Sequence, residues 1–264
     1  MPCRRIISTL GCPDLTLEQA LDLAERFGLD GIELRAVAGT VELADWLTAT
    51  YHTPENLSVA LRGRRVSVEA IDASFRLMGS GEDGIDELAA LAPWAEVLGV
   101  RFLRVFDGGP ADAADFTATA AMVRTWNELR HARSWQTGLM VETHDTLLTA
   151  AAIKQFVAAV PGVPILWDTH HTWKKGGEDP LTTWRAVRQH VTHIHVKDSV
   201  ARTESDPPYR YVVPGTGDFP AAPLLAALRQ EYAGAVCLEW ERKWHPELPP
   251  LEEAVASAFR HSWW

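Results

Sequence analysis

Thr192-His193-Ile194-His195-Val196-Lys197-Asp198 is the stretch of the chain from which the fold can be worked out. Its residues alternate strictly, so a β-strand would place the two aliphatic side chains on one face and both histidines and the lysine on the other. Imidazole and ammonium groups on a buried strand are costly unless something pairs with them. The stretch alone leaves open whether these are core histidines with partners, beside a surface lysine, or ligands of a metal or substrate.

The rest of the chain alternates between strand-like and helix-like segments. We expect strands at 6–10, 31–35, 66–71, 100–105, 138–142, 164–168, 192–198 and 235–240. We expect helices at 15–27, 41–61 with a break near Pro54, 84–98, 112–130, 147–160, 180–189, 221–231 and 251–259. Eight such repeats in 264 residues predict an α/β fold, a single (β/α)8 TIM barrel forming one domain over 1–264. A doubly wound open sheet is the alternative, but it would want a glycine-rich phosphate turn where this chain has Gly11-Cys12-Pro13-Asp14.

Composition limits the function classes. The formal net charge of −10 argues against non-specific binding to nucleic acid or to an anionic membrane, although a local basic patch stays open. Cys3, Cys12 and Cys237 lack metal-type spacing, so we expect reduced thiols and a cytoplasmic protein. The N-terminus has no apolar run suited to a secretory signal, and no segment approaches the roughly 20 apolar residues of a membrane span.

Polar side chains of ligand type stand at the carboxyl ends of the expected strands, which is where barrel enzymes carry their active sites. These residues are Glu33, Arg104, Glu142, Asp168, His195 and Glu239. Alternation supports their inward orientation, because Glu142 shares a face with Met140 and opposes Val141.

Glu142, Asp168, His195 and Glu239 form an oxygen-rich set with one imidazole. Such a set suits one divalent metal ion (Mn²⁺, Mg²⁺, Co²⁺ or Zn²⁺) with positions left for two substrate oxygens. The alternative is a buried network without a metal, but three converging carboxylates without a cation would repel one another.

The motifs around these residues resemble those of the xylose-isomerase-like TIM-barrel superfamily, and within it the sugar phosphate isomerase/epimerase group. They are Val141-Glu142-Thr143-His144-Asp145, Trp167-Asp168-Thr169-His170-His171, His193-Ile194-His195-Val196-Lys197-Asp198 and Leu238-Glu239-Trp240-Glu241. The resemblance covers nearly the whole chain. It is weak on substrate, because the group includes ketose 3-epimerases, hydroxypyruvate isomerase, inosose dehydratases and DNA-repair endonucleases.

The resemblance implies roles for individual residues. It makes the four residues named above the metal ligands, with His195 preferred to His193 because the ligand stands three residues before the acidic Asp198. It makes His171, rather than His170, a contact of substrate or of a second metal. The expected substrate-binding set is His171, His144, Lys197, Arg104, Glu33 and Glu241. A rim salt bridge with Asp198 is the alternative for Lys197. In the loop Gly215-Thr216-Gly217, Thr216 stands where relatives often have glutamate.

The chemistry that fits is proton transfer at a carbon beside a carbonyl of a sugar, sugar phosphate or hydroxy-ketone. Glu142 and Glu239 would act as catalytic base and acid, and the metal would stabilise an enediolate. We therefore expect an isomerase or epimerase, with an inosose-type dehydratase as the alternative. An apurinic endonuclease is disfavoured because Arg104 stands where such relatives need histidine. A non-catalytic sugar- or metal-binding barrel and a homodimer both stay open.

Overall fold

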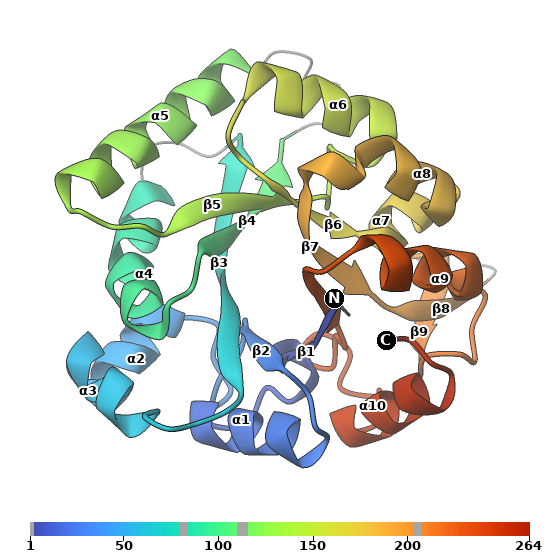
Figure 1. Cartoon of the computed structure of the whole chain (residues 1–264), viewed down its shortest axis with the longest axis horizontal. Coiled ribbons are helices and arrows are strands. Elements are labelled where there is room, and N and C mark those ends of the chain that lie inside the picture. Colours follow the sequence, from blue (N-terminus) through green and yellow to red (C-terminus); the bar gives the residue numbers. More distant parts are fainter. Residues whose placement is uncertain (1–2, 80–83, 110–115, 203–206) are drawn as a thin grey trace.

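A barrel of parallel strands forms the centre of the molecule. The computed structural model describes residues 3–79, 84–109, 116–202 and 207–264. Within these ranges, eight strands close in the order β1-β2-β3-β4-β5-β6-β7-β10. They are β1 (Arg4–Ser8), β2 (Gly31–Leu34), β3 (Ser67–Met78), β4 (Phe102–Gly108), β5 (Gly138–Glu142), β6 (Ile165–Asp168), β7 (Val191–Val196) and β10 (Ala235–Leu238). Figure 1 looks down the barrel and shows the helices in a ring around it. The predicted (β/α)8 fold is confirmed.

The helices of the outer ring begin and end largely as their sequence signals predict. They are α1 (Leu17–Arg26), α2 (Leu43–Tyr51), α3 (Pro54–Ala60), α4 (Gly84–Leu98), α5 (Thr117–Ala132), α6 (Ala150–Ala159), α7 (Thr169–Lys174), α8 (Pro180–Val187), α9 (Ala221–Glu231) and α10 (Leu251–Arg260), with short 3-10 turns η1 (Thr9–Gly11) and η2 (Arg188–His190). Thr16 caps α1 in a reciprocal capping box with Gln19. The expected break near Pro54 is the boundary at which α3 begins.

Three features depart from the expected pattern. β3 continues to Met78, beyond the expected end at Ile71, and exposed and buried residues alternate along its added part from Ser74 to Leu77. The expected strand at 192–198 ends at Val196, and β8 (Asp198–Ala201) pairs antiparallel with β9 (Tyr209–Val212) in a hairpin. Helix α7 was not expected. The beginning of the helix expected at 112–130 falls outside the described residues, and α5 is described from Thr117.

Burial confirms which strand faces point into the barrel. Met140 packs inside it with Ala70 and Leu166, and Cys237 packs inside it with Ile6 and Ala235. Val141, by contrast, belongs to the large hydrophobic core that includes the buried helix faces. Glu142 is therefore on the inward face with Met140, as the alternation predicted.

Asp198 fixes the loop that follows the hairpin. Its Oδ2 accepts hydrogen bonds from the backbone N–H groups of Gly215 and Gly217, both at 2.9 Å. Gly215 has φ +85°, and a Cβ on Gly217 would lie 2.2 Å from Asp198 Oδ1. Both glycines are therefore required by the backbone, one by its conformation and the other by close approach.

None of the described helices is long and apolar enough to cross a lipid bilayer.

Candidate active site

The four residues expected to bind a metal meet at the carboxyl ends of their strands. Glu142 ends β5, Asp168 ends β6, His195 lies on β7 and Glu239 directly follows β10. All four are buried, and their ligand atoms lie within 4.8 Å of one another. Asp168 and His195 are paired neighbours in the barrel register.

The distances within this group suit ligands of one ion. His195 Nδ1 lies 3.2 Å from Glu239 Oε2, 3.6 Å from Glu142 Oε1 and 3.9 Å from Asp168 Oδ2. Donor atoms bound tetrahedrally to one ion at 2.0–2.2 Å are about 3.3–3.6 Å apart. Among the described residues, His195 Nδ1 and Asp168 Oδ2 are buried without a hydrogen-bond partner of good geometry. The donor set therefore fits a divalent cation.

Lys197 places an ammonium group beside two of the four residues. Its Nζ lies 2.9 Å from Asp168 Oδ2 and also contacts the carboxylates of Glu239 and Glu241. The alternative salt bridge with Asp198 is not formed among the described residues, because Asp198 binds the backbone of its own loop. Lys197 is 1% exposed, so this is a buried charge cluster rather than a surface ion pair.

The pKa of Asp168 is raised, whereas those of Glu239 and Glu142 are lowered. Burial raises the pKa of Asp168 to about 6, with Glu239 and Glu142 adding to the effect and Lys197 opposing it. Burial would also raise the pKa of Glu239, but His195 and Lys197 outweigh it and hold that pKa well below its usual value. Against the same effect of burial, Arg104 and His195 lower the pKa of Glu142.

His171 and His144 form one wall next to the ligands. His171 Nδ1 lies 3.3 Å from Asp168 Oδ2, and its ring packs edge-on against that of His144 with centroids 4.6 Å apart. His144 is partly exposed, whereas His171 is buried. His170 contacts Ser199 Oγ at 2.8 Å instead, and the preference for His171 stays a prediction.

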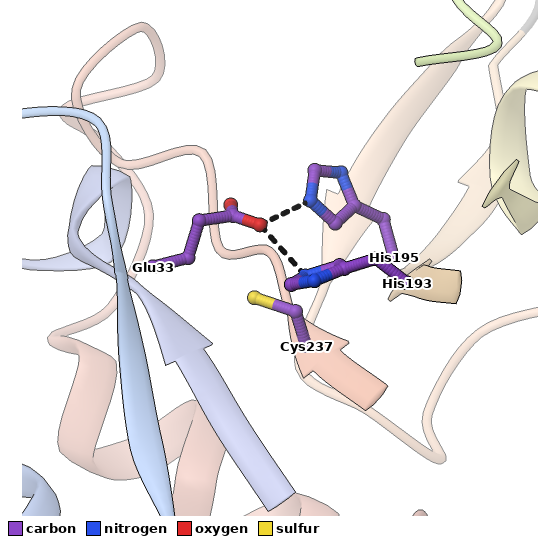
Figure 2. A group of neighbouring side chains, drawn as sticks. All are labelled: Glu33, His193, His195 and Cys237. Carbon is purple, nitrogen blue, oxygen red and sulfur yellow. Dashed lines mark hydrogen bonds and ion pairs between the residues drawn. The ribbon is translucent and has the colours of Figure 1, made fainter. Parts of the chain in front are cut away.

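Glu33 and Arg104 contact two of the candidate ligands. Arg104 Nε is 3.3 Å from Glu142 Oε2, and its Nη2 is 3.1 Å from Asp72 Oδ2. Glu33 contacts the imidazole of His195 (Figure 2). Both residues are at most 1% exposed. Their substrate-binding role stays a prediction, and each of them contacts one of the four candidate ligands, Glu33 contacting His195 and Arg104 contacting Glu142.

Two residues of the site were missed by the sequence interpretation. Asp107, at the end of β4, accepts hydrogen bonds from the backbone N–H groups of residues 144–147 and so holds the loop that carries His144. An aspartate followed by two glycines at a strand end was the available signal. Tyr211 lies on β9, with its ring centroid 5.6 Å from Lys197 Nζ. No signal marked it, because the hairpin was expected to be a loop.

The sequence can be compared with known protein families. Residues 21–261 match the family described as Xylose isomerase-like TIM barrel. The chain belongs to this family. No curated protein matches it at a significant level.

Solved structures share the xylose isomerase-like barrel over almost their whole length. One is the probable 3-DHS dehydratase AsbF of Bacillus anthracis, with a TM-score of 0.75, 19% identity and coverage of 96% of this chain and 97% of that one. Another is the IOLI protein with a bound zinc atom, with a TM-score of 0.74, 17% identity and coverage of 98% of this chain and 96% of that one. A third is the 3-keto-D-glucoside 4-epimerase YcjR of E. coli, with a TM-score of 0.65, 14% identity and coverage of 97% of both chains. At these identities the similarity shows the fold.

Proposed function

We propose that the protein is a divalent-metal-dependent isomerase or epimerase of a sugar, sugar phosphate or related hydroxy-ketone. The observation that carries the proposal is the placement of Glu142 and Glu239 on separate strands, both within 3.6 Å of His195 Nδ1. The ion, held by these three residues and Asp168, would polarise a carbonyl and an adjacent hydroxyl of the substrate and so acidify the C–H of the carbon that bears the hydroxyl.

The chain's own residues supply the proton transfers. The lowered pKa values of Glu142 and Glu239 keep both carboxylates ionised at neutral pH, so either can accept the proton from carbon. The two carboxylates reach the site from different strands, so one can remove a proton and the other can return it. Return to the opposite face gives epimerisation, and return to the neighbouring carbon gives isomerisation.

Other residues would bind and orient the substrate. Lys197 carries three N–H donors and contacts Glu241 as well as Asp168 and Glu239, so it could donate to a substrate oxygen in exchange for one of these contacts. His144 and His171 present imidazole edges on the adjoining wall. The family and its solved relatives support a small-molecule substrate such as a sugar or polyol.

A dehydratase is the second candidate. It is favoured by the overall similarity to the probable 3-DHS dehydratase AsbF and by the same base next to a carbonyl-binding site. After removal of the proton, the hydroxyl on the β-carbon would leave as water, protonated by the glutamic acid that took up the proton, and a conjugated carbonyl would form. Such a product absorbs in the ultraviolet, which an epimer or isomer does not.

Exchange of substrate hydrogen with solvent deuterium tests the proposal. Protein loaded with Mn²⁺, Co²⁺, Mg²⁺ or Zn²⁺ is incubated in D₂O with a panel of ketoses, hydroxy-ketones and their phosphates, and the products are followed by NMR and ultraviolet absorbance. We expect exchange beside a carbonyl, reduced at least about 100-fold in Glu142→Gln and Glu239→Gln. Glu252→Gln, an exposed residue on α10, is the matched control and should keep full exchange. Wild-type protein that exchanges nothing across the panel would refute the proposal.

Metal analysis tests the site independently of turnover. We expect about one divalent ion per chain, lost in His195→Ala and in Glu239→Ala. Retention of the ion by both variants would refute the ligand assignment.

A further inference from the structure

A second group of metal-binding side chain types lies deeper in the barrel. It consists of Glu33, His193, His195 and Cys237, and its ligand atoms also lie within 4.8 Å of one another. Figure 2 shows the carboxylate of Glu33 pointing at both imidazoles, with the thiol of Cys237 nearby. The question is whether this group would hold a second ion or serves the first.

The distances in this deeper group are those of hydrogen bonds. Glu33 Oε2 lies 2.8 Å from Nε2 of His193 and 2.8 Å from Nε2 of His195. A thiolate-containing set favours tetrahedral zinc, in which donor atoms are about 3.3–3.6 Å apart. The spacing is therefore too short for a shared zinc ion, whereas the spacing around His195 Nδ1 on the other side of the ring is not.

We infer that Glu33 is a positioning residue that orients His195 as a metal ligand. The ionised carboxylate can only accept, so Nε2 of His195 must donate its hydrogen to Glu33. Nε2 then keeps its hydrogen when the imidazole is neutral, and the lone pair of Nδ1, once its own proton has left, is directed toward Glu142, Asp168 and Glu239. The inference rests on the proposed function, since it concerns the same metal centre.

The barrel holds Glu33 rigidly enough for this role. Glu33 pairs with Ser8 on β1 and with Ala70 on β3, and its side chain is fully buried. The pairing of β2 with β3 shifts register between Ile32 and Glu33, an irregularity that re-aims the side chain that follows it. His193 Nε2, at 2.8 Å from the same oxygen, acts as a second brace.

Two variants and two readouts test the inference. Glu33→Met removes the acceptor at similar length, and Glu33→Gln keeps an acceptor oxygen without the charge. Zn²⁺ affinity is measured by competitive titration, and the Nε2–H proton of His195 is followed by ¹H–¹⁵N NMR and assigned by its loss in His195→Asn. We expect Zn²⁺ binding about 10–100-fold weaker in Glu33→Met, with loss of a slowly exchanging Nε2–H signal. Glu33→Gln should fall between this variant and the wild type.

Cys237→Ala is the matched control, because Cys237 is fully buried in the same layer. We expect it to bind Zn²⁺ within about threefold of the wild type and to keep the Nε2–H signal. If Cys237→Ala lost as much Zn²⁺ affinity as Glu33→Met, the positioning role would be refuted, because a change in packing alone would then explain the weaker binding. Wild type that binds no Zn²⁺ would refute the metal centre and the inference with it. Wild type and Glu33→Met that bind Zn²⁺ equally tightly would refute the inference alone.

Discussion

Asp168→Asn should weaken metal binding and yet stabilise the metal-free protein. Asp168 is fully buried, and its Oδ1 caps α7 by accepting from the backbone N–H groups of His170 and His171, both at 2.8 Å. Asparagine keeps an acceptor for this cap and removes the charge. The other carboxylate oxygen of Asp168, Oδ2, faces His195 and Lys197.

The magnitude follows from the pKa of Asp168. Burial raises it from 3.8 to about 6, with Glu239 and Glu142 adding to the effect against Lys197. A folded-state pKa above the unfolded one means that ionisation costs stability. The cost is absent below about pH 3.8 and complete above about pH 6. The full cost of ionising Asp168 in the folded state is about 3 kcal/mol, and at about pH 4.5 it is about 1 kcal/mol.

Urea denaturation of the metal-free proteins measures this difference. We expect Asp168→Asn to raise the free energy of unfolding by up to about 3 kcal/mol at pH 8, and by about 1 kcal/mol at pH 4.5. Glu239→Gln is the control of opposite sign. His195 and Lys197 hold the pKa of Glu239 low against the effect of burial, so its neutralisation should destabilise the protein. An Asp168→Asn variant no more stable than the wild type at pH 8, or equally changed at both pH values, would refute the reasoning.

Three further predictions concern the rest of the site. Asp107→Ala should lower the free energy of unfolding by about 1–3 kcal/mol and speed hydrogen exchange at residues 144–147, because their N–H groups lose their acceptor; unchanged exchange would contradict this. Lys197→Met should bind Zn²⁺ at least about tenfold more tightly in a competitive titration, because a cation is removed from the carboxylates; equal or weaker binding would contradict this. Zn²⁺ affinity should rise with pH, because Glu239 and Glu33 raise the pKa of His195 against the effect of burial and the ion must displace its proton; a pH-independent affinity would argue against His195 as a ligand.

Periodicity and strand-end chemistry predict most of this fold and the four converging residues. Alternation alone placed Glu142 inside the barrel with Met140, and the structure confirms it. The carboxyl end of β5 was predicted at Glu142 and lies there, because Glu142 closes an otherwise apolar strand. Local signals sufficed at these positions because each side chain faces inward or outward according to its own strand.

Contacts between distant segments could not be predicted in the same way. Tyr211, which lies beside Lys197, comes from β9, and this strand pairs with β8 only because the chain turns back on itself after Ala201. Helix α7 spans six residues and is held by the side chain of Asp168, which a search for longer helical periodicity does not detect. Glu33 lies near the end of a strand like the other ligand-type residues, and its contact with Nε2 of His195, across the ring from Nδ1, distinguishes it from them.

Three converging carboxylates without a cation would repel one another, and two side chains of the protein itself supply part of the compensating positive charge. Arg104 lies against Glu142 on the buried side, while Lys197 lies against Asp168 and Glu239. Arg104 binds Glu142 through Oε2 and leaves Oε1 facing His195, so it can stay in place when an ion binds. Lys197 contacts the same carboxylate oxygens that would bind the ion. At the proposed metal site the two cations would therefore differ: Arg104 could stay against Glu142, whereas Lys197 would give up its contacts with Asp168 and Glu239 to an ion and keep only its contact with Glu241.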